Sequence, residues 1–127
     1  MGNRDEIRYS RTHEWARIEG DLARIGLSDY AQEHLGDVVD LDLPGPGKRV
    51  REGEAMGSVD SVKAASDIYS PVTGEVVEVN SAVESSPEIV NQDAEGTGWL
   101  LLVRLELPAR IENLMSKAEY GEYVRTL

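Results

Sequence analysis

The stretch from residue 58 to residue 76 reads Ser-Val-Asp-Ser-Val-Lys-Ala-Ala-Ser-Asp-Ile-Tyr-Ser-Pro-Val-Thr-Gly-Glu-Val and places Lys63 between small apolar neighbours. Small, polar and apolar residues alternate loosely before the lysine, and a second run after it leads into Pro71 and Gly74. Two such runs around a short break are typical of β-strands joined by a tight turn. We therefore predict a hairpin with its turn at Val62–Ala64 and with Lys63 at the tip.

The simplest interpretation of Lys63 is a solvated surface lysine, and its surroundings favour a more specific one. The chain has only three lysines, Lys48, Lys63 and Lys117, and only Lys63 lies between small apolar residues. Small flanking side chains would let another protein close over the amine. A lysine amine on a rigid hairpin tip would therefore suit the attachment of a cofactor arm.

The run from Asp60 to Asp67, followed by Tyr69-Ser70-Pro71 and Gly74-Glu75-Val76, resembles the lipoylation motif of glycine cleavage system H proteins. Biotin carriers differ from it because they have methionine on both sides of the lysine. The lipoyl domains of 2-oxo acid dehydrogenase acyltransferases differ as well, since they usually carry Asp-Lys-Ala. The resemblance extends from His13 to about Tyr120 and so covers more than a bare lipoyl domain.

The resemblance implies a carrier with lipoate joined by an amide to Lys63. Such a carrier moves an aminomethyl group from glycine decarboxylase to aminomethyltransferase and passes electrons to dihydrolipoamide dehydrogenase. A lipoate ligase or a lipoyl/octanoyl transferase would attach the cofactor. Two alternatives stay open: an H-like lipoate-binding protein of another pathway, such as heterodisulfide-reductase-like sulfur oxidation or lipoyl relay, or an unmodified interaction domain. The chain departs from the usual family pattern at Asp40, Asp42, Asp60 and Ala94-Glu95.

The same resemblance implies a cleft in which the arm rests. Its wall would contain apolar residues for the alkyl chain and carboxylates for a cationic amine. The implied residues are Glu14, Ala31, His34, Leu35, Ala64 and Asp67. The plain alternative is that Glu14 and Asp67 are solvated acids at strand edges and that His34 is an ordinary surface histidine.

Length and composition limit the other possibilities. A chain of 127 residues predicts one domain, residues 1–127, which acts as a lipoyl carrier if the resemblance holds. The net charge of −11 disfavours nucleic acid and anionic membranes, because both bind through cationic contacts. The chain has no cysteine, no apolar run long enough to span a membrane and no apolar signal segment in its first six residues. We expect a cytoplasmic monomer that is not itself an enzyme, since no nucleophile–base pair or metal cluster is evident.

Local patterns predict a mostly β fold with short peripheral helices and a C-terminal helix, and the resemblance implies two small sheets of the barrel-sandwich-hybrid type. Gly20-Asp21 marks a turn, Ser28 or Asp29 begins a helix, and the capping box that starts at Ser116 opens the last helix. The expected elements are a hairpin over 7–26, a helix through Leu35, a strand over 38–43, a short helix from Ser86-Pro87-Glu88, a core strand over 99–103 and a helix through Val124.

Overall fold

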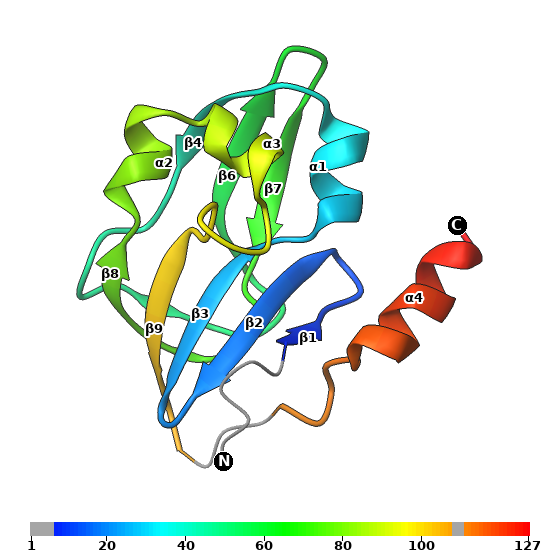
Figure 1. Cartoon of the computed structure of the whole chain (residues 1–127). Coiled ribbons are helices and arrows are strands. Elements are labelled where there is room, and N and C mark those ends of the chain that lie inside the picture. The colour runs from blue at the N-terminus through cyan, green and yellow to red at the C-terminus, as the bar shows by residue number, and fades with distance from the viewer. Residues whose placement is uncertain (1–6, 108–110) are drawn as a thin grey trace.

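The computed structural model describes residues 7–107 and 111–127, so the first six residues and the expectation that they form no signal segment lie outside the described part. The chain forms two antiparallel β-sheets with short helices around them, and a C-terminal helix stands to one side (Figure 1). The predicted mostly β barrel-sandwich hybrid is thereby confirmed.

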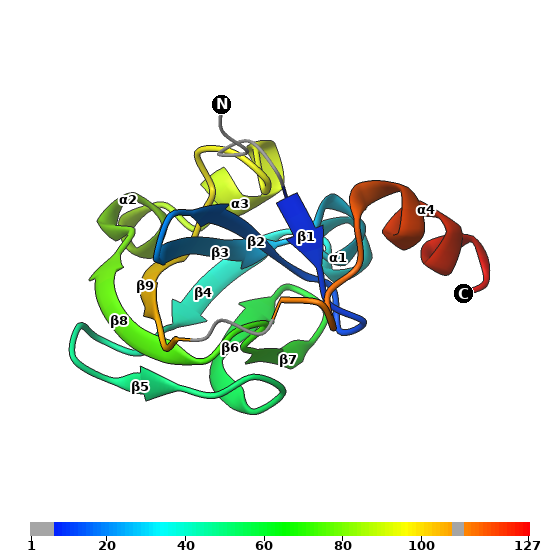
Figure 2. The ribbon, with the colours of Figure 1, turned by 90° about the horizontal axis from the view of Figure 1, so that it is seen from below.

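Six strands form the larger sheet, which is seen from below in Figure 2. In spatial order they are β1 (Ile7–Tyr9), β2 (Glu14–Glu19), β3 (Leu22–Leu27), β9 (Leu101–Leu105), β8 (Gly74–Val79) and β5 (Arg49–Val50). The smaller sheet has the order β4 (Val38–Asp42), β6 (Ala55–Ser61) and β7 (Ala65–Tyr69). The hairpin of β6 and β7 projects at the top of Figure 1 and carries the lysine turn.

Within the part of the chain that the structure describes, four helices lie outside the sheets. They are α1 (Asp29–Leu35), α2 (Ser81–Ser85), α3 (Glu88–Gln92) and α4 (Lys117–Arg125). The predicted caps are present, because the Ser28 side chain accepts from the Ala31 amide and Ser116 forms a complete capping box with Glu119. None of the helices in the described residues is long and apolar enough to cross a membrane.

The two sheets share one apolar core. Val59 and Ile68 of the smaller sheet are buried in the same cluster as Ile25 and Val103 of the larger sheet. A second, aromatic cluster of Tyr9, Trp15 and Tyr120 attaches α4 to the outer edge of the larger sheet. The C-terminal helix is therefore held by aromatic contacts rather than by the main core.

The hairpin predicted over residues 7–26 was wrong at its start. β1 pairs separately with β2, and residues 10–13 form a turn between them. The Ser10 amide donates to the Glu14 carbonyl at 2.8 Å, and the His13 amide donates to the Ser10 carbonyl at 3.1 Å. These two bonds close the turn, so that the strand begins at Glu14.

Other elements also differ from the prediction, and the strand expected over 38–43 ends at Asp42. The core strand begins at Leu101 instead of Trp99, because the Trp99 amide closes a turn on the carbonyl of Gly96. Helix α2 was not predicted; the Asn80 side chain begins it by accepting from the Ala82 amide. Helix α4 ends at Arg125, one residue beyond the predicted Val124.

Candidate functional site

The turn between β6 and β7 presents Lys63 to solvent. The Ser61 amide donates to the Ala64 carbonyl at 2.8 Å, which closes the turn with Val62 and Lys63 at its centre. The Ser61 hydroxyl oxygen accepts from the amides of Lys63 at 3.3 Å and Ala64 at 3.1 Å. The structure thus places Lys63 at a hairpin tip, as the alternating pattern indicated, and Ser61 organises that tip.

The tip is also held against the end of helix α1. The Val62 amide donates to the Asp37 carbonyl at 3.0 Å, just after Gly36 ends the helix with φ of 78°. A Cβ atom at Gly36 would lie 3.1 Å from Cε of Lys63. Glycine at this position therefore allows both the backbone conformation and the close approach of the lysine side chain.

A cleft of about 310 Å³ lies between α1, the turn before β2 and strand β7. Five of the six predicted cleft residues line it, namely Glu14, Ala31, His34, Leu35 and Asp67. The sixth, Ala64, does not line the cleft and instead belongs to the lysine turn. The lining also includes residues that the sequence did not single out: Thr12, His13, Leu27, Tyr30, Val59 and Ser66.

Glu14 is the buried carboxylate of this cleft, with a relative exposure of 1%. Its carboxylate accepts hydrogen bonds from the Ser10 hydroxyl at 2.8 Å, from the Thr12 hydroxyl and from the Tyr69 amide at 3.0 Å. Burial raises the pKa of this carboxyl group, while the hydrogen bonds oppose the rise. The interpretation of Glu14 as a solvated strand-edge acid was wrong, because its carboxylate is buried and accepts from the Tyr69 amide of the other sheet. Asp67, by contrast, is exposed.

Aromatic rings form one side of the cleft. The Tyr30 ring lies between two imidazoles, with centroid distances of 4.7 Å to His13 and 4.1 Å to His34. Burial lowers the pKa of His13, and the neighbouring His34 lowers it further. The His13-Glu14-Trp15 run was the sequence signal that could have identified His13 as a lining residue.

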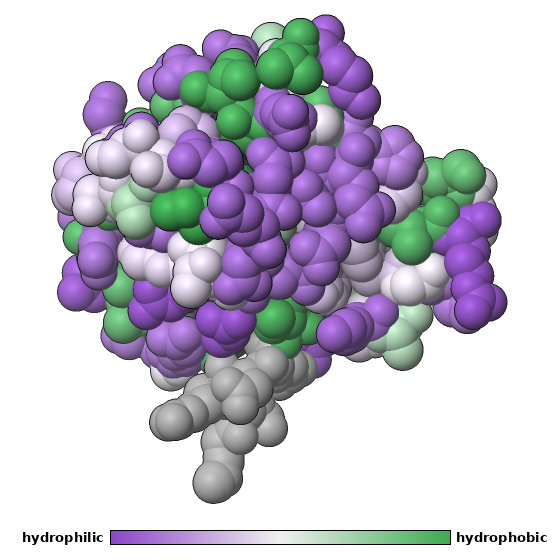
Figure 3. All heavy atoms as spheres, turned by 45° about the horizontal axis from the view of Figure 1, so that its top comes forward, coloured by the Kyte–Doolittle hydropathy of each residue, from purple (hydrophilic) through white to green (hydrophobic). Residues whose placement is uncertain are grey.

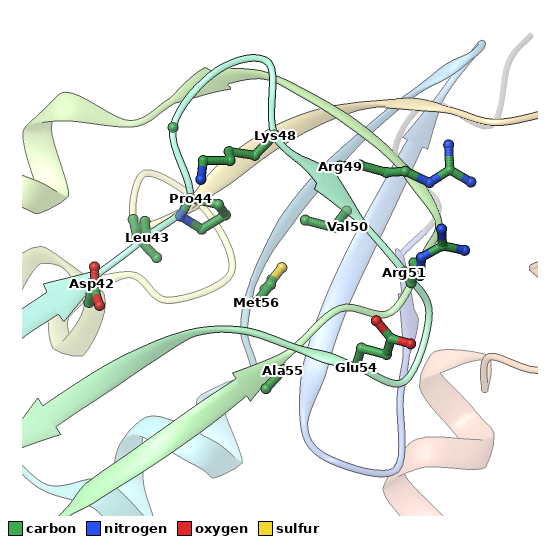
Figure 4. A pocket seen from close by; sticks show the side chains of 11 residues that line it. Asp42, Leu43, Pro44, Lys48, Arg49, Val50, Arg51, Glu54, Ala55 and Met56 are labelled. Atoms are coloured by element: carbon green, nitrogen blue, oxygen red, sulfur yellow. The ribbon is translucent and has the colours of Figure 1, made fainter.

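A second hollow, of about 380 Å³, lies beside β5 at the opposite end of β6 from the lysine tip. In Figure 4 the Lys48 side chain lies along this hollow, whereas the side chains of Arg49 and Arg51 point away from it. Arg49 pairs with Glu106 at 2.6 Å. The hollow thus contains few groups that converge on a ligand, in contrast to the cleft beside Glu14.

Neither hollow contains a metal site. Within residues 7–107 and 111–127, no group of three or more His, Asp or Glu side chains is arranged to hold a metal ion.

The end of the molecule that carries the hairpin is mostly hydrophilic, with a few separate hydrophobic patches (Figure 3). Exposed Val62 and Val39 are among the large apolar residues at the surface.

The two sheets, the lysine tip and the adjoining cleft define a β domain of the barrel-sandwich-hybrid class that presents an amine beside a cleft. Residues 7–127 match the family model described as glycine cleavage H-protein, and the chain belongs to that family. Membership of this family implies a carrier component of the glycine cleavage system, with lipoate as the cofactor of the family.

Curated relatives and a solved structure agree with this assignment. The chain is 50% identical to the glycine cleavage system H protein of Parvibaculum lavamentivorans, over 96% of this chain and 98% of that one. It is 56% identical to the protein of the same name from Rubrobacter xylanophilus, over 91% and 90% of the two chains. The crystal structure of a glycine cleavage system H protein from Mycobacterium marinum superposes with a TM-score of 0.87 at 35% identity, covering 96% of this chain and 98% of that one.

Proposed function

We propose that Lys63 is the lipoyl-lysine of a glycine cleavage carrier. The observation that carries this proposal is the position of Lys63, exposed at a hairpin tip in a chain of the H-protein family. Hydrogen bonds of the Ser61 side chain define the turn, so the amine projects from an ordered backbone. Such a tip offers the amine to a modifying enzyme, either a lipoate ligase or a lipoyl/octanoyl transferase.

The cleft fits a short alkyl arm with a polar end. Leu27, Ala31, Leu35 and Val59 supply apolar surface, and the acids Glu14 and Asp67 supply negative charge. Its volume of about 310 Å³ is at the lower end of the range of small-ligand pockets. When bound, lipoate supplies a dithiolane that accepts and releases a one-carbon amine group and electrons.

In this proposal, the chain's own residues hold and shield the arm. The apolar wall keeps water from the cargo, and Glu14 and Asp67 attract its cationic amine. Glycine decarboxylase would load the carrier, aminomethyltransferase would unload it, and dihydrolipoamide dehydrogenase would reoxidise it. Because the arm is tethered, each transfer takes place at a high local concentration.

We further propose that residues 1–127 act as one lipoyl-carrier domain, a cytoplasmic monomer that is not itself an enzyme. The cleft then protects cargo, and the partner enzymes carry out the chemistry. Binding of nucleic acid or membranes forms no part of this function, in keeping with the net charge of −11.

Peptide mass spectrometry of protein from its native host tests the attachment site. We expect a lipoyl adduct on Lys63 and none on Lys48 or Lys117, which serve as internal controls. Native protein that is wholly unmodified at Lys63 would contradict the proposal and support an unmodified interaction domain.

Loading with labelled glycine then tests the pathway. Lipoylated protein should take up label from glycine in the presence of glycine decarboxylase. A lipoylated protein that stays unlabelled under conditions that load another H protein would indicate a different pathway, such as sulfur oxidation or lipoyl relay.

A further inference from the structure

The turn that precedes Glu14 has an unusual backbone. Among the residues that the structure describes, His13 is the one non-glycine residue with a positive φ, 78°. A positive φ is unfavourable for residues other than glycine, and such a backbone conformation persists where surrounding contacts hold it. Since His13 and Glu14 are adjacent, whatever holds His13 also sets where the Glu14 carboxylate lies.

Three hydrogen bonds and several aromatic contacts hold His13. Its amide donates to the Ser10 carbonyl at 3.1 Å. Its carbonyl accepts from the Ser28 amide at 3.0 Å. Its Nδ1 lies 2.7 Å from the hydroxyl of Tyr120, which is 107 residues away in sequence. The imidazole also packs against the ring of Tyr30. The ring of Tyr123 also lies 6.0 Å from the imidazole. Tyr120 and Tyr123 both belong to the C-terminal helix α4, and Tyr120 is the one whose hydroxyl bonds His13.

Tyr120 is itself firmly fixed. Its relative exposure is 6%, and its ring stacks on that of Tyr9 with centroids 4.4 Å apart and an interplanar angle of 3°. In Figure 1, α4 stands beside β1, apart from the main body of the sheets. The stack of Tyr120 on Tyr9 belongs to the aromatic cluster that attaches α4 to this edge.

The Tyr120 hydroxyl joins two walls of the cleft. It contacts His13 on the side of Glu14 and also lies 2.8 Å from the Ser28 hydroxyl. Ser28 caps α1 by accepting from the Ala31 amide at 3.1 Å. One buried hydroxyl group therefore links the turn that carries Glu14 to the helix that supplies the opposite, apolar wall.

We propose that Tyr120 is a positioning residue for the arm cleft, which it holds in shape from the C-terminal helix through His13 and Ser28. This inference rests on the proposed carrier function. Without the hydroxyl, the strained turn at His13 loses a partner and the two walls lose their common contact. Water then gains access to Glu14 and to the cargo beside it.

Tyr120→Phe tests the inference because it removes only the hydroxyl and keeps the ring that stacks on Tyr9. Tyr123→Phe is the matched control: it removes a hydroxyl that bonds the Arg11 carbonyl at 3.2 Å, and it keeps the ring that lies 6.0 Å from the His13 imidazole. In unmodified protein, NMR would follow the ring nitrogens of His13 and the titration of the Glu14 carboxyl. We expect Tyr120→Phe to shift the His13 signals strongly and to lower the pKa of Glu14 towards its ordinary value. Tyr123→Phe should shift the His13 signals much less and leave the titration of Glu14 unchanged.

In loaded protein, Tyr120→Phe should speed the loss of the one-carbon amine by about three- to tenfold, as expected for the loss of one buried hydrogen bond. An unchanged Glu14 titration, or an equal effect of Tyr123→Phe, would overturn the inference. If lipoylated protein cannot be loaded from glycine, the proposed role in glycine cleavage fails, whereas the NMR measurements on unmodified protein still decide the role of Tyr120.

Discussion

Two short turns of this molecule each present a charged residue, and they do so in opposite ways. A serine side chain organises both: Ser61 bonds the amides of the lysine turn, and Ser10 bonds the amide and carboxylate of Glu14. Lys63 nevertheless ends in solvent, whereas Glu14 is 1% exposed.

The difference lies in the range of the contacts. The lysine turn is closed by bonds within four residues, with one further bond from Val62 to Asp37. The Glu14 turn depends on partners 55 and 107 residues away, namely Tyr69, which bonds Glu14, and Tyr120, which bonds His13. An exposed lysine at the tip of a turn can thus be formed locally, but a shielded carboxylate requires the whole fold around it.

The largest effect is expected from a substitution of Lys63, the exposed residue in this comparison. Lys63→Arg should abolish lipoylation and carriage completely, because a guanidinium is not acylated in place of an amine. Its free energy of unfolding should change by no more than about 0.5 kcal/mol, as for other exposed positions. Intact mass measures lipoylation and thermal unfolding measures stability. Lys48→Arg is the control that should keep full lipoylation. A large loss of stability would show that Lys63 is structural.

The next largest effect is expected from a substitution of Glu14, the buried residue. Glu14→Ala removes the acceptor of the Ser10, Thr12 and Tyr69 donors, so we expect a loss of about 3 kcal/mol in unfolding free energy. Loaded protein should also release its ammonia and formaldehyde about tenfold faster, with lipoylation unchanged. Denaturant unfolding and decay of the isolated loaded protein are the measurements. Glu33→Ala, an exposed glutamate of α1, is the control, and equal decay rates would exclude Glu14 from cargo protection.

A third change tests the contact between the lysine turn and the end of α1. Gly36→Ala should cost about 2 kcal/mol, because φ of 78° with ψ of −155° is a region almost restricted to glycine. The added Cβ would also press on Cε of Lys63, so the signals of residues 61–64 should shift in NMR spectra. Gly121→Ala is the matched control: a Cβ there meets open space in a helix, and it should stabilise the protein by about 0.5–1 kcal/mol. Unchanged stability of Gly36→Ala would refute the proposed constraint.

The smallest expected effect is the pH dependence that Glu14 gives to the unfolding free energy. Burial raises the pKa of Glu14 in the folded state, so the folded protein binds a proton that the unfolded chain releases. Its contribution to stability is therefore fully present below the unfolded pKa and is lost as pH rises through the folded value. Relative to Glu14→Gln, the wild-type protein should gain stability as pH falls from 7 towards 4.5. Denaturant unfolding at several pH values measures the difference, and a gap that stays constant would contradict a raised pKa.

The sequence by itself determined the features that depend on neighbouring residues. The lysine tip, the Gly20-Asp21 turn, the Ser28 cap and the Ser116 capping box were all predicted and confirmed, because turns and caps are formed by side chains a few residues apart. The mostly β fold followed from the same local alternation of side chains.

Only the tertiary structure decided what lies around Glu14. Alternation suggested a strand through residues 12–18, but the turn at 10–13 and the Tyr69 amide from the other sheet bury the carboxylate. The exclusion of Ala64 from the cleft lining and the late start of β9 at Leu101 likewise follow from contacts that a linear pattern does not specify. The contact between His13 and Tyr120 spans 107 residues, so no local signal could reveal it, and it exists only because packing of α4 against β1 brings the two side chains together.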